Sequence, residues 1–150
     1  MAARLRDDEL RAWRALLHAH LDVTRRLDGD LRREHGLSLT DYDILLRLAN
    51  GPRTGLRMSD LSERVMSPPS TVTRRLDGLV AHGLVARSGH GSDSRIILAT
   101  LTPMGRQRLR RAAVTHLRGV RERFTNKLTA AQLEAVAVAL EEVSGPHQPH

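Results

Sequence analysis

The chain has 150 residues and carries 24 basic against 17 acidic side chains, a net charge of +7 that favours an anionic partner such as nucleic acid, an acidic membrane or an anionic ligand. It contains no cysteine, which excludes disulfides, thiolate metal sites and thiol nucleophiles. No apolar run reaches the roughly 18 residues of a membrane span, and aromatic residues are too sparse for a single-strand stacking platform.

The first expected element is a long helix over residues 8–34, because apolar residues recur in steps of three or four while charges fill the other faces. Gly36 ends it. A helix this long in a small protein is expected to pack against something beyond its own domain. A second helix begins with Thr40 as its N-cap and ends at Gly51 and Pro52.

A polar loop over 53–58 precedes a short helix that starts with Ser59 as N-cap and ends near Met66. The third helix has the clearest start signal, with Ser67 as the expected cap and Pro68 at the first helical position. It is predicted to end at His82, with Gly83 as the left-handed residue that follows. Its buried stripe is predicted to be Val72, Leu76, Leu79 and Val80.

Two short strands, 84–86 and 95–101, form a predicted hairpin, and the polar segment 87–94 forms its mobile tip. Thr102 and Pro103 then open a helix that runs to about Asn126. Thr129 and Gln132 make a capping box for the last helix. That helix ends at Gly145, and residues 145–150 are predicted to be a flexible tail.

Three helices followed by a hairpin is the order of a winged helix-turn-helix, in which the third helix enters the major groove and the wing reaches the minor groove. The predicted fold is therefore mainly α with a small β-hairpin wing. Arg74 is long enough to bind a guanine edge, and Arg95 suits a narrow minor groove, where Asp93 would orient its guanidinium. The outward positions of the third helix are small or basic: Ser70, Thr71, Thr73 and Arg74, with Ser67 at its start.

The segments SPPSTVTRRLDGLVAHGLVAR, SDSR and LTPMGRQRL resemble the multiple antibiotic resistance regulator (MarR) family, as do GLSLTDYDILLRL and MSDLSERV. The resemblance covers roughly residues 8–143. It implies a homodimeric regulator, in most members a repressor of a pseudo-palindromic operator, and in many members released by a small anionic aromatic ligand. It also implies a DNA-binding lobe over 36–102 and helical dimerisation segments over 8–35 and 103–144 within a single 1–150 domain.

By the same resemblance, Ser70, Thr71, Thr73 and Arg74 match recognition-helix positions, and Asp93 and Arg95 match the wing. The chain departs from the family at Ser94, where members usually carry a second arginine, so a weaker grip on phosphate is expected there. The consecutive prolines 68 and 69 also differ from many members and are expected to stiffen the start of the helix.

Trp13, Asp43, Arg75 and Arg87 stand at places similar to the ligand residues of a urate-sensing subgroup of the family. A tryptophan can stack on a planar ring and arginines can hold an anion. The alternative is structural: Trp13 packs in the dimer core, Asp43 pairs locally with an arginine, and both arginines lie near phosphate. We favour the structural alternative.

No histidine spacing typical of a metal site appears, and no nucleophile or nucleotide-binding motif is present, so we expect no metal, no cofactor and no enzymatic activity. The N-terminus has no apolar signal segment, so we expect a cytoplasmic protein, and the predicted DNA-binding role places it at the nucleoid. The competing hypothesis is a winged-helix module that binds protein without reading DNA.

The positive charge is concentrated in residues 103–127, which hold eight basic side chains and one acidic side chain. We expect the first basic residues of this helix to attract DNA or face an anionic ligand. The later ones are expected to pair with acids of the first and last helices across the dimer.

Overall fold

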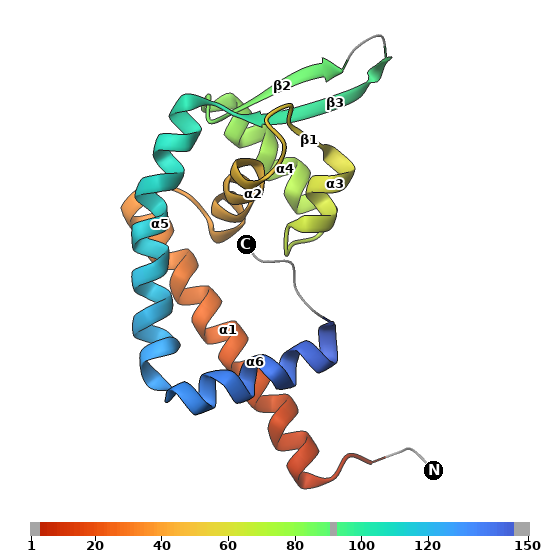
Figure 1. The fold of residues 1–150 in the computed structure, drawn as a ribbon. Coiled ribbons are helices and arrows are strands. Elements are labelled where there is room, and N and C mark those ends of the chain that lie inside the picture. The colour runs from red at the N-terminus through yellow and green to blue at the C-terminus, as the bar shows by residue number, and fades with distance from the viewer. Residues whose placement is uncertain (1–3, 91–92, 146–150) are drawn as a thin grey trace.

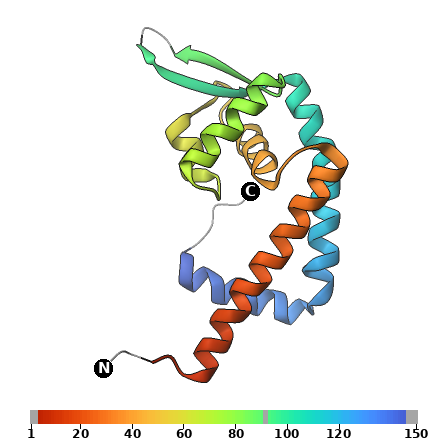
Figure 2. The same ribbon diagram turned by 180° about the vertical axis from the view of Figure 1, so that it is seen from behind.

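The computed structural model describes residues 4–90 and 93–145, except for the side chains of His90, Asp93 and Ser94. A compact lobe carries the sheet, and the N-terminal and C-terminal helical segments extend together to one side of it (Figures 1 and 2). In chain order the elements are α1 (Asp7–His35), α2 (Leu39–Asn50), β1 (Leu56–Arg57), α3 (Met58–Arg64), α4 (Pro69–Ala81), β2 (Val85–His90), β3 (Asp93–Leu101), α5 (Pro103–Arg123), a 3-10 turn η1 (Thr125–Lys127) and α6 (Ala130–Ser144). The predicted class, mainly helical with a small β wing, is confirmed.

The sheet is antiparallel with strand order β1-β3-β2. Val85 pairs with Leu101 at its base, and Leu56 of β1 pairs with Ala99. The loop predicted over 53–58 therefore contains a strand, because Leu56 is apolar enough to be buried beside β3. The wing strands are also longer than predicted, since β2 extends to His90 and β3 begins at Asp93. Residues 91–92 and 146–150, in the predicted tip and tail, lie outside the described residues.

Three of the predicted caps, Thr40, Ser59 and Ser67, are wrong. Ser38, not Thr40, caps α2: its Oγ accepts from the N–H of Asp41 at 3.0 Å, and Asp41 returns the bond at 2.7 Å. This reciprocal pair satisfies two amides at once, which a cap at Thr40 does not. Helix α3 begins one residue before Ser59, with Arg57 at the N-cap.

Helix α4 starts one residue later than predicted, with Pro68 at the N-cap and Pro69 at the first helical position. Ser67 does not cap this helix, because its hydroxyl lies 3.1 Å from the hydroxyl of Thr40. Gly83 has φ +72° after the end of the helix, as predicted. The predicted capping box of α6 is also present, whereas α5 ends at Arg123, earlier than predicted.

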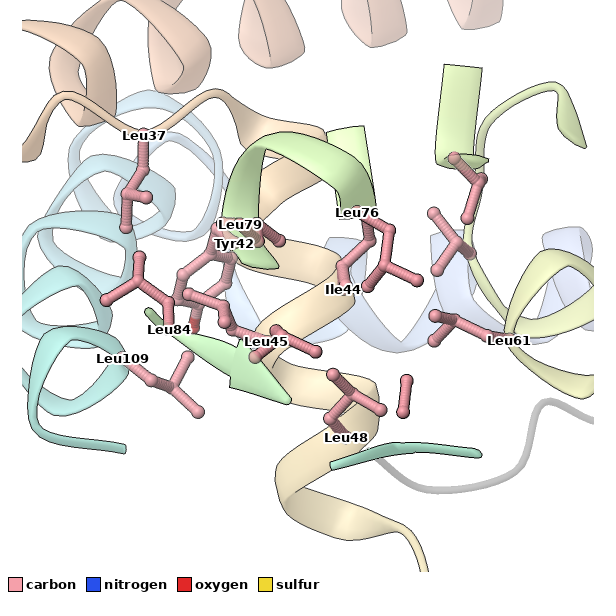
Figure 3. Close-up of a cluster of buried hydrophobic side chains, with 14 of the residues drawn as sticks. Leu37, Tyr42, Ile44, Leu45, Leu48, Leu61, Leu76, Leu79, Leu84 and Leu109 are labelled. Carbon is pink, nitrogen blue, oxygen red and sulfur yellow. The ribbon is translucent and has the colours of Figure 1, made fainter. Parts of the chain in front are cut away.

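The core of the lobe lies around α2 (Figure 3). Ile44 and Leu45 are completely buried, and they meet Leu76 of α4, Leu61 of α3 and Leu109 of α5 in one apolar cluster. This cluster fixes the buried face of α4, so the opposite face, which carries Ser70, Thr73 and Arg74, points outward.

Helices α1 and α5 pack along each other below the lobe, and α6 continues from the far end of α5, away from the wing (Figure 1). Gly119 allows the close approach of α1 and α5, because a Cβ there would lie 2.6 Å from Leu27 and 2.8 Å from Arg123. Arg123 pairs with Asp30 at 2.5 Å, and Arg118 pairs with Glu34 at 2.6 Å. These late basic residues of α5 therefore pair with acids of their own chain, where a pairing across the dimer was expected.

Candidate DNA-binding surface

The first turn of α4 is an exposed surface built from short side chains. Ser70 and Thr73 are exposed and Thr71 is half-buried. The Thr73 hydroxyl donates to the carbonyl of Pro69 at 3.1 Å, so its proton is used within the helix and its oxygen remains an acceptor. Since prolines occupy the N-cap and the next position, only the amides of Ser70 and Thr71 remain free at this end.

Arg74 follows one residue later and is exposed at the surface of the same helix. Its guanidinium can form the bidentate hydrogen bonds that suit guanine O6 and N7. A short hydroxyl surface beside one long guanidinium lets the helix backbone approach base edges closely while one side chain reaches further. The predicted residues Ser70, Thr71, Thr73 and Arg74 thus lie together on one turn and a half of α4.

The wing extends from the lobe beside α4 (Figure 1). Arg95 is exposed in the outer part of β3. The Asp93 side chain, predicted to orient Arg95, lies outside the described residues. Arg87 of β2 forms an ion pair with Asp77 of α4, a contact that joins the wing to the helix and that the sequence did not predict.

A groove of about 680 Å³ lies between α4 and α5, next to the end of α1. Arg75 stands at its edge, 3.7 Å from the buried carboxylate of Asp41, and the first turns of α5 add Arg108 and Arg111. The groove is therefore lined by several cations and by apolar groups such as Leu79 and Met104. That combination suits a small anion with an apolar body.

Of the four residues that resemble the ligand residues of the urate-sensing subgroup, the structure brings one, Arg75, to this groove. Trp13 lies on α1 with 52% of its surface exposed. Asp43 accepts from Arg47 at 3.1 Å, so the expected local pairing of Asp43 with an arginine is present. Arg87 pairs with Asp77.

The lobe joins α5 through an aromatic contact. The Tyr42 and His116 rings stack with centroids 4.5 Å apart. Burial raises the pKa of Tyr42 and lowers the pKa of His116, while Asp43 acts in the opposite direction on His116. On the other side of α5, the guanidinium of Arg118 and the hydroxyl of Thr115 hold the pKa of Glu34 below its usual range.

Two findings concern other kinds of site. Within residues 4–90 and 93–145, no cluster of three or more histidine or acidic side chains is arranged to hold a metal ion. Among the same residues, no helix is both long and apolar enough to cross a bilayer.

Comparison with known proteins supports a regulator. A family model for the MarR family matches residues 35–96. The Bacillus subtilis HTH-type transcriptional repressor YetL is 36% identical over 74 residues, which are 49% of this chain and 44% of YetL. The regulator YdgJ from the same organism is 31% identical over 61% of this chain and 54% of its own length, so the chain aligns with about half of each of these two relatives.

Two solved structures from Streptomyces coelicolor match nearly the whole chain. AbsC, a MarR family transcriptional regulator, is 31% identical with a TM-score of 0.86, covering 95% of this chain and 96% of AbsC. Sco3205, a MarR family regulator solved in complex with DNA, is 30% identical with a TM-score of 0.88, covering 99% of this chain and 93% of Sco3205. The winged helix, the outward face of α4 and these matches together identify the chain as a member of the MarR family of transcriptional regulators, which are DNA-binding proteins and not enzymes.

Proposed function

We propose that the protein is a homodimeric regulator that binds a pseudo-palindromic operator in double-stranded DNA and represses transcription. The observation that carries this proposal is the outward face of α4, where Ser70, Thr73 and Arg74 stand beside a wing that bears Arg95. In this role α4 enters the major groove, Arg74 binds a guanine edge and Arg95 enters the adjacent minor groove. The related YetL is named a repressor, which favours the same sign of regulation.

The apolar surface of the helical segments supports the homodimer. Leu17 and Leu21 of α1, Leu117 of α5 and Val138 of α6 are between 45% and 63% exposed. Helix α6 has no buried residue, although its sequence is rich in alanine and valine. Because a helix this apolar is unfavourable in water, a second copy of the chain is the partner that would cover it. A dimer would also place two α4 helices on one DNA duplex.

The groove between α4 and α5 supports the proposal that a small anionic molecule with an apolar body binds there and causes the protein to release DNA. It lies between the helix that would read DNA and α5, so a molecule bound there contacts both. Arg75 faces Asp41 across the edge of this groove, and an anion would offer Arg75 a second partner. Such a regulator would act in the cytoplasm, at the nucleoid.

Selection of bound duplexes from a random pool tests the DNA function. We expect an enriched pseudo-palindrome whose half-sites lie about 10–11 base pairs apart or a multiple of that spacing. Binding should weaken with salt, with a log–log slope near −0.9 for each phosphate contact. A pool without enrichment, together with a flat salt dependence, would instead favour a winged-helix module that binds protein.

Benzoate, a small aromatic anion, is a suitable probe for the effector function. We expect millimolar benzoate to weaken operator binding by the full-length protein, and Arg111→Ala, in the groove, to reduce this effect. Arg121→Ala, on the exposed end of α5 outside the groove, is the matched control and should respond as the unmodified protein does. An equal response of both variants to benzoate would place the binding site elsewhere.

A further inference from the structure

We propose that Asp43 is a positioning residue for DNA recognition, which holds the turn between α3 and α4 and thereby sets where the first turn of α4 meets DNA. This inference rests on the proposed DNA-reading function. It assigns Asp43 a role in place of the ligand contact that the family resemblance suggested.

The two carboxylate oxygens of Asp43 have different partners. Oδ1 accepts from Nε of Arg47, one turn along α2, at 3.1 Å. Oδ2 accepts from the backbone N–H of Met66, 23 residues later in the chain, also at 3.1 Å. The side chains of Asp43 and Arg47 are only 19% and 18% exposed, so this ion pair is partly shielded from water.

A second bond from α2 reaches the next residue of the same turn. The Thr40 hydroxyl lies 3.1 Å from the Ser67 hydroxyl. Thr40 and Asp43 are three residues apart on one face of α2, so two consecutive residues of the turn are held by one side of a buried helix. The Met66 side chain is 80% exposed, which means that its burial does not anchor the turn.

The start of α4 depends on this turn more than the rest of the helix does. The apolar anchors of α4 are Val72, Leu76 and Leu79, and the exposed residues Pro69 and Ser70 precede the first of these anchors. Pro68 and Pro69 have no N–H with which to anchor the preceding segment. The Ser67 N–H donates to the carbonyl of Val65 at 2.8 Å within the turn, and the bonds from Asp43 and Thr40 are the side-chain restraints that tie this turn to α2.

Base-edge hydrogen bonds need placement within a fraction of an ångström, whereas contacts with phosphates tolerate small shifts. Loss of the Asp43 restraint should therefore reduce specific binding more than non-specific binding. A residue that only stabilised the fold would reduce both in proportion to the unfolded fraction.

The test compares Asp43→Ala, Asp43→Asn and Arg47→Met in the full chain, against the selected operator and a scrambled duplex. We expect Asp43→Ala to lose roughly tenfold in operator affinity and less than about twofold for scrambled DNA. Asp43→Asn keeps an oxygen for Met66 and should restore most of the selectivity, and Arg47→Met leaves the Met66 bond in place and should also retain it.

Hydrogen exchange of the Met66 amide reports the restraint without DNA. Exchange should be faster in Asp43→Ala than in Asp43→Asn and in the unmodified protein. Unchanged exchange, or unchanged selectivity in Asp43→Ala, would overturn the inference.

If Asp43→Ala does not fold, Thr40→Val removes the neighbouring bond and has the same two outcomes: lost selectivity supports the inference and retained selectivity overturns it. If the unmodified protein shows no sequence preference, the proposed function fails, and the exchange measurement still tests the restraint.

Discussion

The ring of His116 on α5 stacks on the ring of Tyr42 on α2, with the two planes inclined by 26°. Burial leaves His116 Nδ1 without a hydrogen-bond partner and lowers the pKa of the imidazole. The folded protein therefore favours the neutral form of the His116 ring. This contact connects the lobe to the helix that leaves it.

We expect this histidine to make the protein less stable in mild acid. Burial holds the folded-state pKa of His116 below its usual value of 6.5, so below that pH the unfolded chain binds more protons than the folded chain. The contribution of His116 to the free energy of unfolding should be fully present above about pH 6.5 and should decrease as the pH falls toward the lowered pKa. His116→Phe keeps a stacking ring and should flatten this dependence, measured by urea unfolding at fixed protein concentration. The exposed His82, changed to Ala, is the control, and equal slopes in the two variants would contradict the assignment.

Arg74→Ala should weaken operator binding by about 1–3 kcal/mol and relax the preference at one base pair of each half-site. The reason is the loss of two hydrogen bonds to one guanine edge. A binding assay over single-base operator variants measures both effects. Arg121→Ala, which removes an exposed charge near the end of α5, should keep the base preference. If Arg74→Ala keeps its affinity and preference as well, Arg74 does not read a base.

Gly105→Ala should destabilise the protein by about 1–3 kcal/mol. A Cβ at this position would collide with the carbonyl oxygen of Leu84, where α5 starts against the base of the wing. Thr102 fixes the same junction, since its hydroxyl donates to Gly83 at 2.7 Å and accepts from the Gly105 amide at 2.9 Å. Gly29→Ala, in open space on α1, should be neutral or slightly stabilising. Thermal unfolding of both variants measures the difference, and equal melting temperatures would show that α5 can shift.

Arg123→Met should cost more stability than Arg33→Met, although both arginines bind Asp30. Arg33 is the largest cause of the lowered pKa of Asp30, followed after burial by Arg123. Arg33, however, is 67% exposed, so water can replace it, whereas Arg123 is 22% exposed and faces a carboxylate that is only 9% exposed. We expect about 1–2 kcal/mol for Arg123→Met and less than about 1 kcal/mol for Arg33→Met in chemical unfolding. The reverse order would mean that the inter-helix pair contributes little.

Val138→Glu should convert the dimer to a monomer. Val138 is 50% exposed on α6, where the second copy is proposed to pack, and a buried unpaired carboxylate there is costly. Sedimentation measures the mass. Ile97→Glu, at an exposed apolar position of similar exposure on the wing, is the control and should remain dimeric. A monomeric unmodified protein, or a dimeric Val138→Glu, would contradict the proposed interface.

Helix positions and the buried face of α4 were predictable because apolar spacing in this chain follows the helical period closely. The same pattern placed Ser70, Thr73 and Arg74 on the outside. Strand β1 was not predictable, because two residues give no alternation and Leu56 pairs with Ala99 of β3, which lies 43 residues later in the chain. The contact of Asp43 with Met66 could not be predicted either. Asp43 accepts from the backbone N–H of Met66, and any residue other than proline at position 66 could donate this bond. Ser67 shows how a tertiary contact can override a local signal. A serine before a proline suggests an N-cap, but the Ser67 hydroxyl instead forms a hydrogen bond with the Thr40 hydroxyl of α2.

Arg74 lies on the border of two surfaces, because it is exposed on α4 and also lines the groove beside α5. A bidentate contact with guanine occupies one edge of the Arg74 guanidinium, and that edge cannot bind a carboxylate at the same time. If both proposed ligands use it, each must weaken the other by the same factor, whichever arrives first. Operator DNA would then lower the affinity for the small molecule as much as the small molecule lowers the affinity for DNA, even without any movement of the helix.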